Sequence, residues 1–280
     1  MPSVCFTAGV AAKERDDVFA SICFCPIIDL EHADMAYEWL FQDTDSRLAG
    51  LNLHKADGTP LTGDNFLDYI KELLIASAQK AKNAGADISA DLGFKFNSEA
   101  RGPSQRRYAR RPGGNRPMMR MGGGRVGEYI TDLDMPAYLN YVVSIQPLKG
   151  VPSFDSQGVL GSRASGENEE FGDSTGSSVS FTEYGAAANG VVLTDEIRRN
   201  VILMNPMIFV GNPKATNAPH WYVRHGARDR DASFPVPVAF ATKLENAGLD
   251  VDFLLAWNRP HSGDYALDGV FDWIAQITGR

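Results

Sequence analysis

Two polar loops in the last quarter of the chain carry side chains that could act together as an acid and a base. Asp229 follows the apolar run at 220–223, and His261 follows a second apolar run at 251–257. An imidazole can take a proton from a hydroxyl group and return it to a leaving alcohol, while a carboxylate fixes its tautomer and stabilises its charged form. The pair therefore predicts acid–base chemistry of the kind that activates a serine.

The elements around these loops predict how the two side chains meet. Residues 220–226 and 251–257 have strand patterns, a helix is expected at 235–247 between them, and an amphipathic helix closes the chain. This order predicts an α/β fold with a parallel sheet, whose functional groups collect at the carboxyl ends of the strands. In α/β-hydrolases the triad acid and histidine follow successive strands in the same order.

Elsewhere the element patterns are weaker. Residues 18–30 form a continuous apolar run, which is typical of a strand buried on both faces. We expect Asp64 or Asn65 to cap a helix and Thr194 to start another, whereas residues 152–190, rich in Ser, Gly, Glu and Asn, are expected to form loops. Cys23 and Cys25 alternate within the strand-like run, so they are predicted to be buried thiols and not a disulfide.

The composition excludes several classes of protein. Of the 280 residues 44% are apolar and 22% are charged, as in globular proteins, and no apolar run is long enough to span a membrane. The net charge of −8 argues against nucleic-acid or anionic-membrane binding by the whole chain. No signal peptide is visible, and neither the compartment, cytoplasmic or secreted, nor the oligomeric state is predicted.

Residues 99–127 differ in composition from the rest of the chain. They hold eight arginines and many Gly and Pro residues, with few groups able to form a core. Such a stretch could bind RNA or another polyanion, but Tyr108 alone offers stacking for bases. We therefore expect a disordered loop and no nucleic-acid partner.

Three segments resemble the bacterial tannases of subtype B, α/β-hydrolases that cleave galloyl esters. Residues 220–265 (HWYVRHGARDRD to RPHSGDY) look like the C-terminal core of that family, and residues 16–41 (DDVFASICF to AYEWLF) look like a core strand leading into its lid. LKGVPSFD, followed by ENEEFG, is similar to the lid segment that returns to the active site. The resemblance implies the C-terminal half of an α/β-hydrolase parallel sheet with a large lid insertion.

The resemblance also implies domains and site residues. Residues 1–34 would hold a truncated core strand, residues 35–190 the lid, and residues 191–280 the part of the core with acid and base. The residues carried over are the triad acid Asp229, the triad base His261, and three groups that contact the phenolic ring, Asp231, Lys149 and Glu167, with Glu169 as a competitor of Glu167. The implied substrate is a small phenolic ester, and neither a metal nor an organic cofactor is implied.

The nucleophile is the missing part of this prediction. The string Gly172 to Gly176 has the G-x-S-x-G form around Ser174, but its flanks are polar and do not suit a strand-to-helix turn. In the tannases the nucleophile precedes the strand matched by residues 18–30. We therefore expect a truncated chain that is inactive alone.

Three alternatives remain open. Asp229 and Asp231 could form a solvated charge cluster with Arg224, Arg228 and Arg230. The protein could instead be a feruloyl or general aryl esterase with the same triad. It could also be a non-catalytic protein that binds phenolic ligands. His225 is expected to have a structural role and not to act as a second base.

Overall fold

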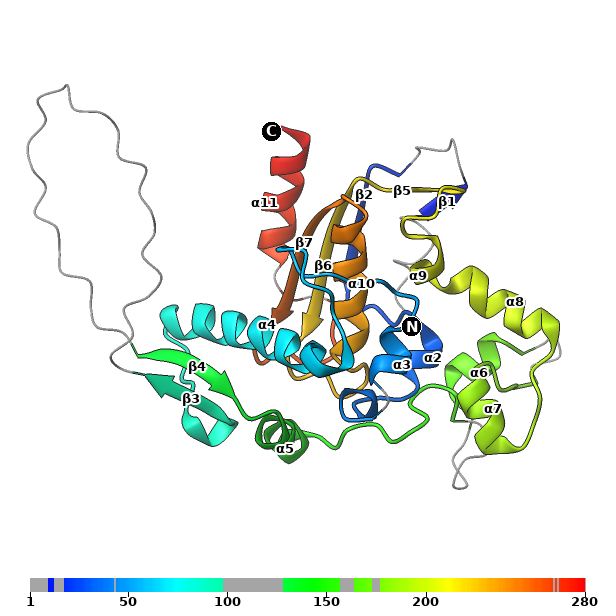
Figure 1. The fold of residues 1–280 in the computed structure, drawn as a ribbon, viewed down its shortest axis with the longest axis horizontal. Helices are drawn as coiled ribbons and strands as arrows, with labels where there is room; N and C mark the ends of the chain where they lie inside the picture. Colours follow the sequence, from blue (N-terminus) through cyan, green and yellow to red (C-terminus); the bar gives the residue numbers. More distant parts are fainter. Residues whose placement is uncertain are drawn as a thin grey trace, which may run out of the picture.

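A three-stranded parallel sheet lies at the centre of the computed structural model (Figure 1). The structure describes residues 10–12, 18–42, 44–97, 128–156, 164–172, 177–263, 265 and 267–279. The sheet has the order β2 (Ala20–Phe24), β6 (His220–Gly226) and β7 (Asp250–Ala256), and both pairings are parallel. The predicted α/β fold with a parallel sheet is thus confirmed, and β6 has the predicted bounds.

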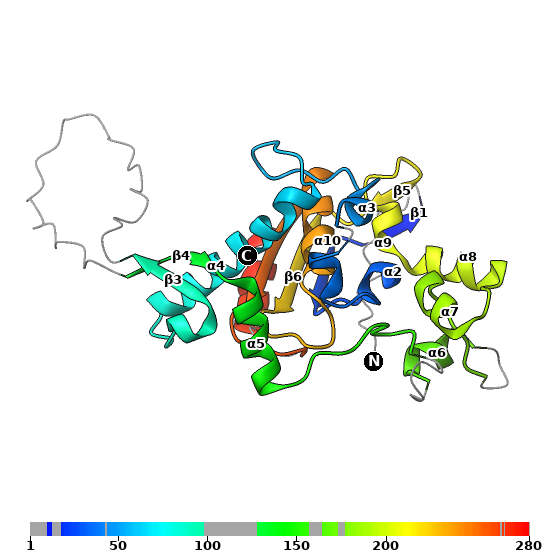
Figure 2. The same cartoon turned by 60° about the horizontal axis from the view of Figure 1, so that its bottom comes forward.

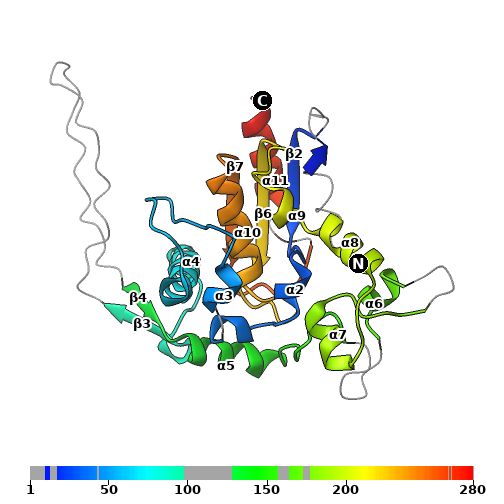
Figure 3. The same cartoon turned by 45° about the vertical axis from the view of Figure 1, so that its right-hand side comes forward.

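Helices cover both faces of this sheet (Figures 1 and 3). The side chains of β6 alternate, so that Trp221 packs against Phe240 of α10 (Pro235–Asn246) on one face. On the other face, Tyr222 packs against Trp273 of α11 (Leu267–Thr278). Each of these pairs has ring centroids about 5.5 Å apart. Among the described helices none is both long and apolar enough to cross a membrane.

Helix α4 (Gly63–Asn83) packs on the same side as α10. Its buried residues Phe66, Ile70, Leu74 and Ala78 recur every four positions, and Ser77 donates a hydrogen bond of 2.5 Å to the carbonyl of Leu255 in β7. The prediction that Asp64 or Asn65 is the N-cap of this helix is wrong.

Thr62 is the N-cap of α4, and Asn65 is its partner three residues later. The backbone N–H of Thr62 donates to the side chain of Asn65 at 2.9 Å, which completes a capping box. The residue types were therefore right for a helix start, but the polar residue that begins the helix lies earlier.

The apolar run at 18–30 forms a shorter strand than predicted. Strand β2 ends at Phe24, because Cys25 has a left-handed backbone (φ 43°) and Pro26 follows it. Cys23 and Cys25 are both buried and lie in different hydrophobic clusters, as their alternation predicts. Neither forms a disulfide bond within the described part of the chain.

Two small antiparallel pairs lie outside the central sheet. Strand β3 (Phe94–Asn97) pairs with β4 (Tyr129–Leu133), and Asn97 lies opposite Tyr129. The predicted Arg/Gly-rich loop falls between these strands and outside the described residues. Strand β1 (Val10–Ala12) pairs with β5 (Ala215–Asn217), a pairing with no sequence signal.

The other helices lie around the sheet, and 152–190 is not loop throughout. Helices α6 and α7 fall within that range and correct the prediction, whereas α8 follows its N-cap Thr194 as predicted. The remaining elements are α2 (Leu30–Ala33), η1 (Glu38–Leu40), α3 (Thr44–Leu48), η2 (Ala90–Leu92), α5 (Met135–Ile145), α6 (Gly166–Glu170), α7 (Glu183–Asn189), α8 (Asp195–Met204) and α9 (Pro206–Phe209).

A buried polar network joins the segments around Asp155, Asn168 and Thr182 to the core. Asp34 accepts hydrogen bonds from the amides of Phe154 (2.7 Å) and Asp155 (2.8 Å) and from the hydroxyl of Thr182 (2.5 Å). Asp155 in turn accepts from the side chain of Asn168 (2.7 Å) and the amide of Thr182 (3.0 Å). These four polar residues are almost fully buried, and their hydrogen bonds join segments that are distant in the sequence.

We expect Asp34 to make stability depend on pH. Burial raises its pKa from 3.8 to about 6, so the folded state keeps a proton that the unfolded state loses at lower pH. Stability should therefore fall by up to about 3 kcal/mol as pH rises from about 4 to about 7. Asp34→Asn mimics the protonated acid and should remove this part of the dependence. Urea unfolding at several pH values measures the free energy of unfolding of the two proteins. If this free energy changes with pH equally in both, Asp34 is not the source of the pH dependence.

Candidate active site

The loops after β6 and β7 meet at the carboxyl end of the sheet. The amide of Ala227 donates to the carbonyl of Ala256, and the amide of Arg228 donates to that of Arg259, both at 2.9 Å. A Cβ on Gly226 would lie 2.4 Å from the carbonyl oxygen of Pro260, so only glycine permits this approach. The two loops are thus held side by side.

Asp229 and His261 meet at this junction. His261 Nδ1 lies 2.8 Å from Asp229 Oδ2, which confirms the contact predicted from the order of the elements. Asp229 is fully buried, whereas 31% of the His261 side chain is exposed. The carboxylate is therefore shielded from water, and the imidazole can reach a substrate.

Backbone amides fix the orientation of Asp229. Its Oδ1 accepts hydrogen bonds from the amides of Asp231 (2.8 Å) and Ala232 (3.0 Å), which leaves Oδ2 for His261. The hydroxyl of Tyr37 donates to the Asp229 carbonyl at 2.6 Å. The carboxylate thus has one defined orientation, as a group that must hold a histidine tautomer requires.

The charges in this pair support each other. Burial by itself would raise the pKa of Asp229, but the neighbouring imidazoles and the hydrogen bonds from His261 and the amide of Ala232 lower it overall. The hydrogen bond to Asp229 raises the pKa of His261, and the negative charge of Asp231 adds to this effect. Asp229 is thus ionised at neutral pH, and His261 is a stronger base than an isolated histidine.

Asp231 and Lys149 lie beside the pair. Side-chain atoms of Asp231, Asp229 and His261 are within 4.8 Å of one another. The amide of Lys149 donates to the carbonyl of Arg230 at 3.1 Å, and its ammonium lies 4.3 Å from the ring centroid of Phe154. The structure therefore brings four of the five predicted site residues together.

Glu167 is the fifth predicted site residue. It lies in α6, is half-buried, and makes no hydrogen bond or ion pair with the other four among the described residues. Ser165 connects its segment to the site by donating to the carbonyl of Phe154 at 2.6 Å. Glu169 is exposed, so of the two glutamates Glu167 is the better candidate for a contact with the ligand.

The alternative that Asp229 and Asp231 form a solvated charge cluster with arginines fits only Asp231. Asp231 lies 3.7 Å from Arg230 Nε, and both side chains are partly exposed. Asp229 has imidazole and amide partners and no ion pair with an arginine in the described part of the chain. Asp229 is therefore part of a buried hydrogen-bonding site and not of a surface cluster.

The sequence predicted His225 as a structural loop residue and did not indicate the other groups that support the site. His225 lies in β6 with no exposure and places Nε2 3.4 Å from Asp229 Oδ2. Tyr138 of α5 donates to the carbonyl of Ala227 at 2.5 Å, and Figure 2 shows α5 and the segment after it near this end of the sheet. No sequence motif marks Tyr37 or Tyr138. The position of His225 at the end of a strand pattern, however, was a signal for a buried group.

A metal ion would compete with the hydrogen bonds of the site. Cys25, His225 and Asp229 form a second set of possible ligand atoms within 4.8 Å, next to the set of Asp229, Asp231 and His261. Both sets share Asp229, whose oxygens already accept from two amides and His261. A bound ion would therefore compete with the hydrogen bonds that orient Asp229.

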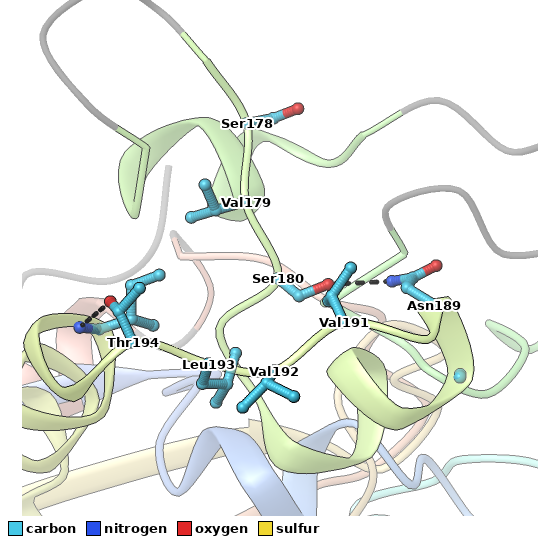
Figure 4. Close-up of a pocket in the computed structure, with 10 residues that line it drawn as sticks. Ser178, Val179, Ser180, Asn189, Val191, Val192, Leu193 and Thr194 are labelled. Atoms are coloured by element: carbon cyan, nitrogen blue, oxygen red, sulfur yellow. Dashed lines mark hydrogen bonds between the residues drawn. The ribbon is translucent and has the colours of Figure 1, made fainter.

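A separate cavity of about 560 Å³ lies between α7 and α8 (Figure 4). Its wall includes Val191, Val192 and Leu193, and Asn189 donates to Ser180 Oγ at 2.9 Å within it. None of the five predicted site residues lines it. This cavity is therefore distinct from the acid–base site.

The G-x-S-x-G string that the sequence analysis set aside falls partly outside the described residues. Of the G-x-S-x-G string, Gly172 is described, but Ser174 is not.

Comparison with known proteins gives matches among solved structures alone. No protein-family model matches the chain, and no curated protein does. A crystal structure of tannase from Lactobacillus plantarum is 30% identical, with a TM-score of 0.74 over 96% of this chain and 63% of the other. A tannin acyl hydrolase in complex with ethyl gallate is 33% identical, with a TM-score of 0.72 over 94% of this chain and 57% of the other.

A second organism gives the same result. The tannase of Fusobacterium nucleatum is 25% identical, with a TM-score of 0.71 over 95% of this chain and 60% of the other. The chain therefore spans about three fifths of the length of the solved structures that it matches. These likenesses cover nearly all of the chain, which is therefore similar to tannases over almost its whole length.

Proposed function

We propose that the protein is a tannase-type carboxylic ester hydrolase that uses a Ser-His-Asp mechanism. The contact of 2.8 Å between buried Asp229 and partly exposed His261 carries this proposal. Its position at the carboxyl ends of neighbouring parallel strands is the place where α/β-hydrolases hold these groups. In this proposal the sheet is the C-terminal half of a hydrolase core, and residues 35–190 contain the lid.

Each residue of the pair has one task. His261 takes the proton from a serine hydroxyl as the serine oxygen bonds to the acyl carbon, and then gives that proton to the leaving alcohol. A water molecule then attacks the acyl-enzyme while His261 takes the water proton and returns it to the serine. Asp229 orients the imidazole and stabilises its charge in both steps.

The acyl group is proposed to be galloyl or a related hydroxybenzoyl group. Asp231 can accept hydrogen bonds from phenolic hydroxyls and Lys149 can donate to them, so that together they distinguish a hydroxylated ring from a bare one. Glu167 would add a contact from α6. Relatives of this chain have been solved with ethyl gallate and with 3,4-dihydroxybenzoate, which supports phenolic ligands.

Methyl gallate hydrolysis tests the proposal. The assay uses the 280-residue chain, and also a chain extended by any coding sequence that precedes it, because the position of the serine is open. Turnover that is lost on Ser174→Ala would identify that residue as the nucleophile. Turnover in the extended chain alone would assign the serine to the added part.

Two other outcomes would redirect the proposal. Equal or faster turnover of a feruloyl ester would favour a feruloyl or aryl esterase. Heat on titration with gallate, without turnover in either chain, would favour a phenolic-ligand-binding protein and reject the hydrolase.

We expect Asp231→Ala to reduce galloyl specificity. Loss of a carboxylate that accepts phenolic hydrogen bonds should lower kcat/KM for methyl gallate by about 10- to 100-fold, because hydrogen bonds to charged groups contribute about 1.5–3 kcal/mol. An acetyl ester, which has no phenolic hydroxyl, should lose less than about threefold. Asp268→Ala, an exposed carboxylate in α11, is the control. Equal losses on both esters would show that Asp231 does not select the acyl group.

A further inference from the structure

We infer that His225 is a positioning residue for Asp229, acting as a neutral imidazole that donates from Nε2. The inference rests on the proposed function, because it concerns the carboxylate that orients His261. His225 lies in β6, one residue before the strand ends, and its side chain is fully buried. It is a second imidazole at the same carboxylate, and the mechanism above gives it no proton to transfer.

The partners of His225 fix where its proton sits. Nε2 lies 3.0 Å from the carbonyl oxygen of Ala232 and 3.4 Å from Asp229 Oδ2. Both atoms are acceptors, so Nε2 must carry hydrogen. The Asp229 oxygen concerned is the one that also contacts His261.

The surroundings of His225 keep it neutral. Its Nδ1 is buried and has no hydrogen-bond partner in the described part of the chain, and the ring packs edge-on against Phe234. A proton on Nδ1 would therefore place a charged imidazole in an apolar contact. Burial lowers the pKa of His225, in agreement with this geometry.

These contacts hold Asp229 at both oxygens. Ala232 receives the His225 hydrogen bond at its carbonyl, and its amide donates to Asp229 Oδ1 at 3.0 Å. His225 thus acts on Oδ1 through Ala232 and faces Oδ2 directly. Because it is a neutral donor, it leaves the negative charge of Asp229 available to His261, whereas an imidazolium would oppose the positive charge that His261 acquires.

The first test measures the tautomer of His225 in the unaltered chain. Nitrogen chemical shifts of 15N-labelled histidines distinguish Nε2–H, Nδ1–H and charged imidazoles. We expect the neutral Nε2–H tautomer at neutral pH. An Nδ1–H tautomer or a charged ring would overturn the inference without the need for any variant.

The second test measures His261 in variants of His225. In His225→Leu the raised pKa of His261 should fall towards that of an ordinary histidine, and its downfield Nδ1 proton resonance should broaden or be lost. His225→Gln keeps a side-chain N–H and should preserve both signals. His220→Gln is the matched control, because His220 pairs with Asp250 at 2.7 Å at the other end of the same strand.

The outcomes separate positioning from a packing role. A folded His225→Leu protein with both His261 signals unchanged would overturn the inference. If that variant does not fold, loss of both signals in a folded His225→Gln protein would count against a role for the N–H donor. These readouts need no ester hydrolysis, so a negative esterase result would leave them valid, and their failure would leave the proposed hydrolase intact.

Discussion

Replacing Asp229 by Asn is expected to lower kcat for ester hydrolysis about 10⁴-fold, the size of loss seen when a serine protease triad loses its carboxylate. An amide at this position can present its NH₂ group to His261 Nδ1, so the imidazole would carry its proton on Nε2. That nitrogen could then no longer accept a proton from serine. The stabilisation of the charged imidazole would disappear together with the right tautomer.

Steady-state kinetics with methyl gallate measures this effect, on whichever form of the protein shows turnover. The raised pKa of His261 should fall in the same variant, because the hydrogen bond that His261 donates to Asp229 is its main cause. Asp250→Asn provides the control, since Asp250 holds His220 in an exposed pair at 2.7 Å. A loss of less than about tenfold in Asp229→Asn would exclude Asp229 as the triad acid.

Replacing Asp155 by Ala is expected to destabilise the fold by about 3–5 kcal/mol. The change removes the acceptor of three hydrogen bonds, from the side chain of Asn168 and from the amides of Phe181 and Thr182, at 2.7–3.0 Å. These donors are buried, so they would lose their partner without gaining water. Asn168, Phe181 and Thr182 would lose the carboxylate that joins them, whereas the hydrogen bonds from Phe154 and Thr182 to Asp34 do not involve this side chain.

Urea unfolding followed by circular dichroism measures this loss. Asp68→Ala, at an exposed carboxylate paired with Lys71, should change stability by less than about 0.5 kcal/mol. Similar effects of the two substitutions would show that the network around Asp155 contributes little.

The helices and strands with a regular pattern of apolar residues could be predicted from the sequence. Strands β6 and β7 and helix α10 were predicted to within one residue, and the start of α8 and the presence of the closing helix α11 were also predicted, since their apolar patterns and flanking Pro, Gly and Thr residues are local signals. The contact between Asp229 and His261 followed from the same elements, because neighbouring parallel strands bring their following loops together.

What the sequence did not reveal depends on distant contacts. Asp34 is about 120 positions from Asp155 and about 150 positions from Thr182 in the sequence, and no periodic pattern marks such distant partners. The pairing of β1 with β5 is of the same kind. The cap of α4 was misplaced for a local reason, since Thr62 and Asn65 are both suitable caps and only their reciprocal bonding identifies the first.

The pairing of β3 with β4 has a practical consequence for protein engineering. Because Asn97 and Tyr129 lie opposite each other, the described residues on either side of the Arg/Gly-rich segment end side by side. A two-residue Asn-Gly turn could therefore replace residues 98–128 without moving either strand. Such a shortened protein would be a smaller starting material for crystallisation and spectroscopy, and the replaced segment contains none of the residues of the acid–base site.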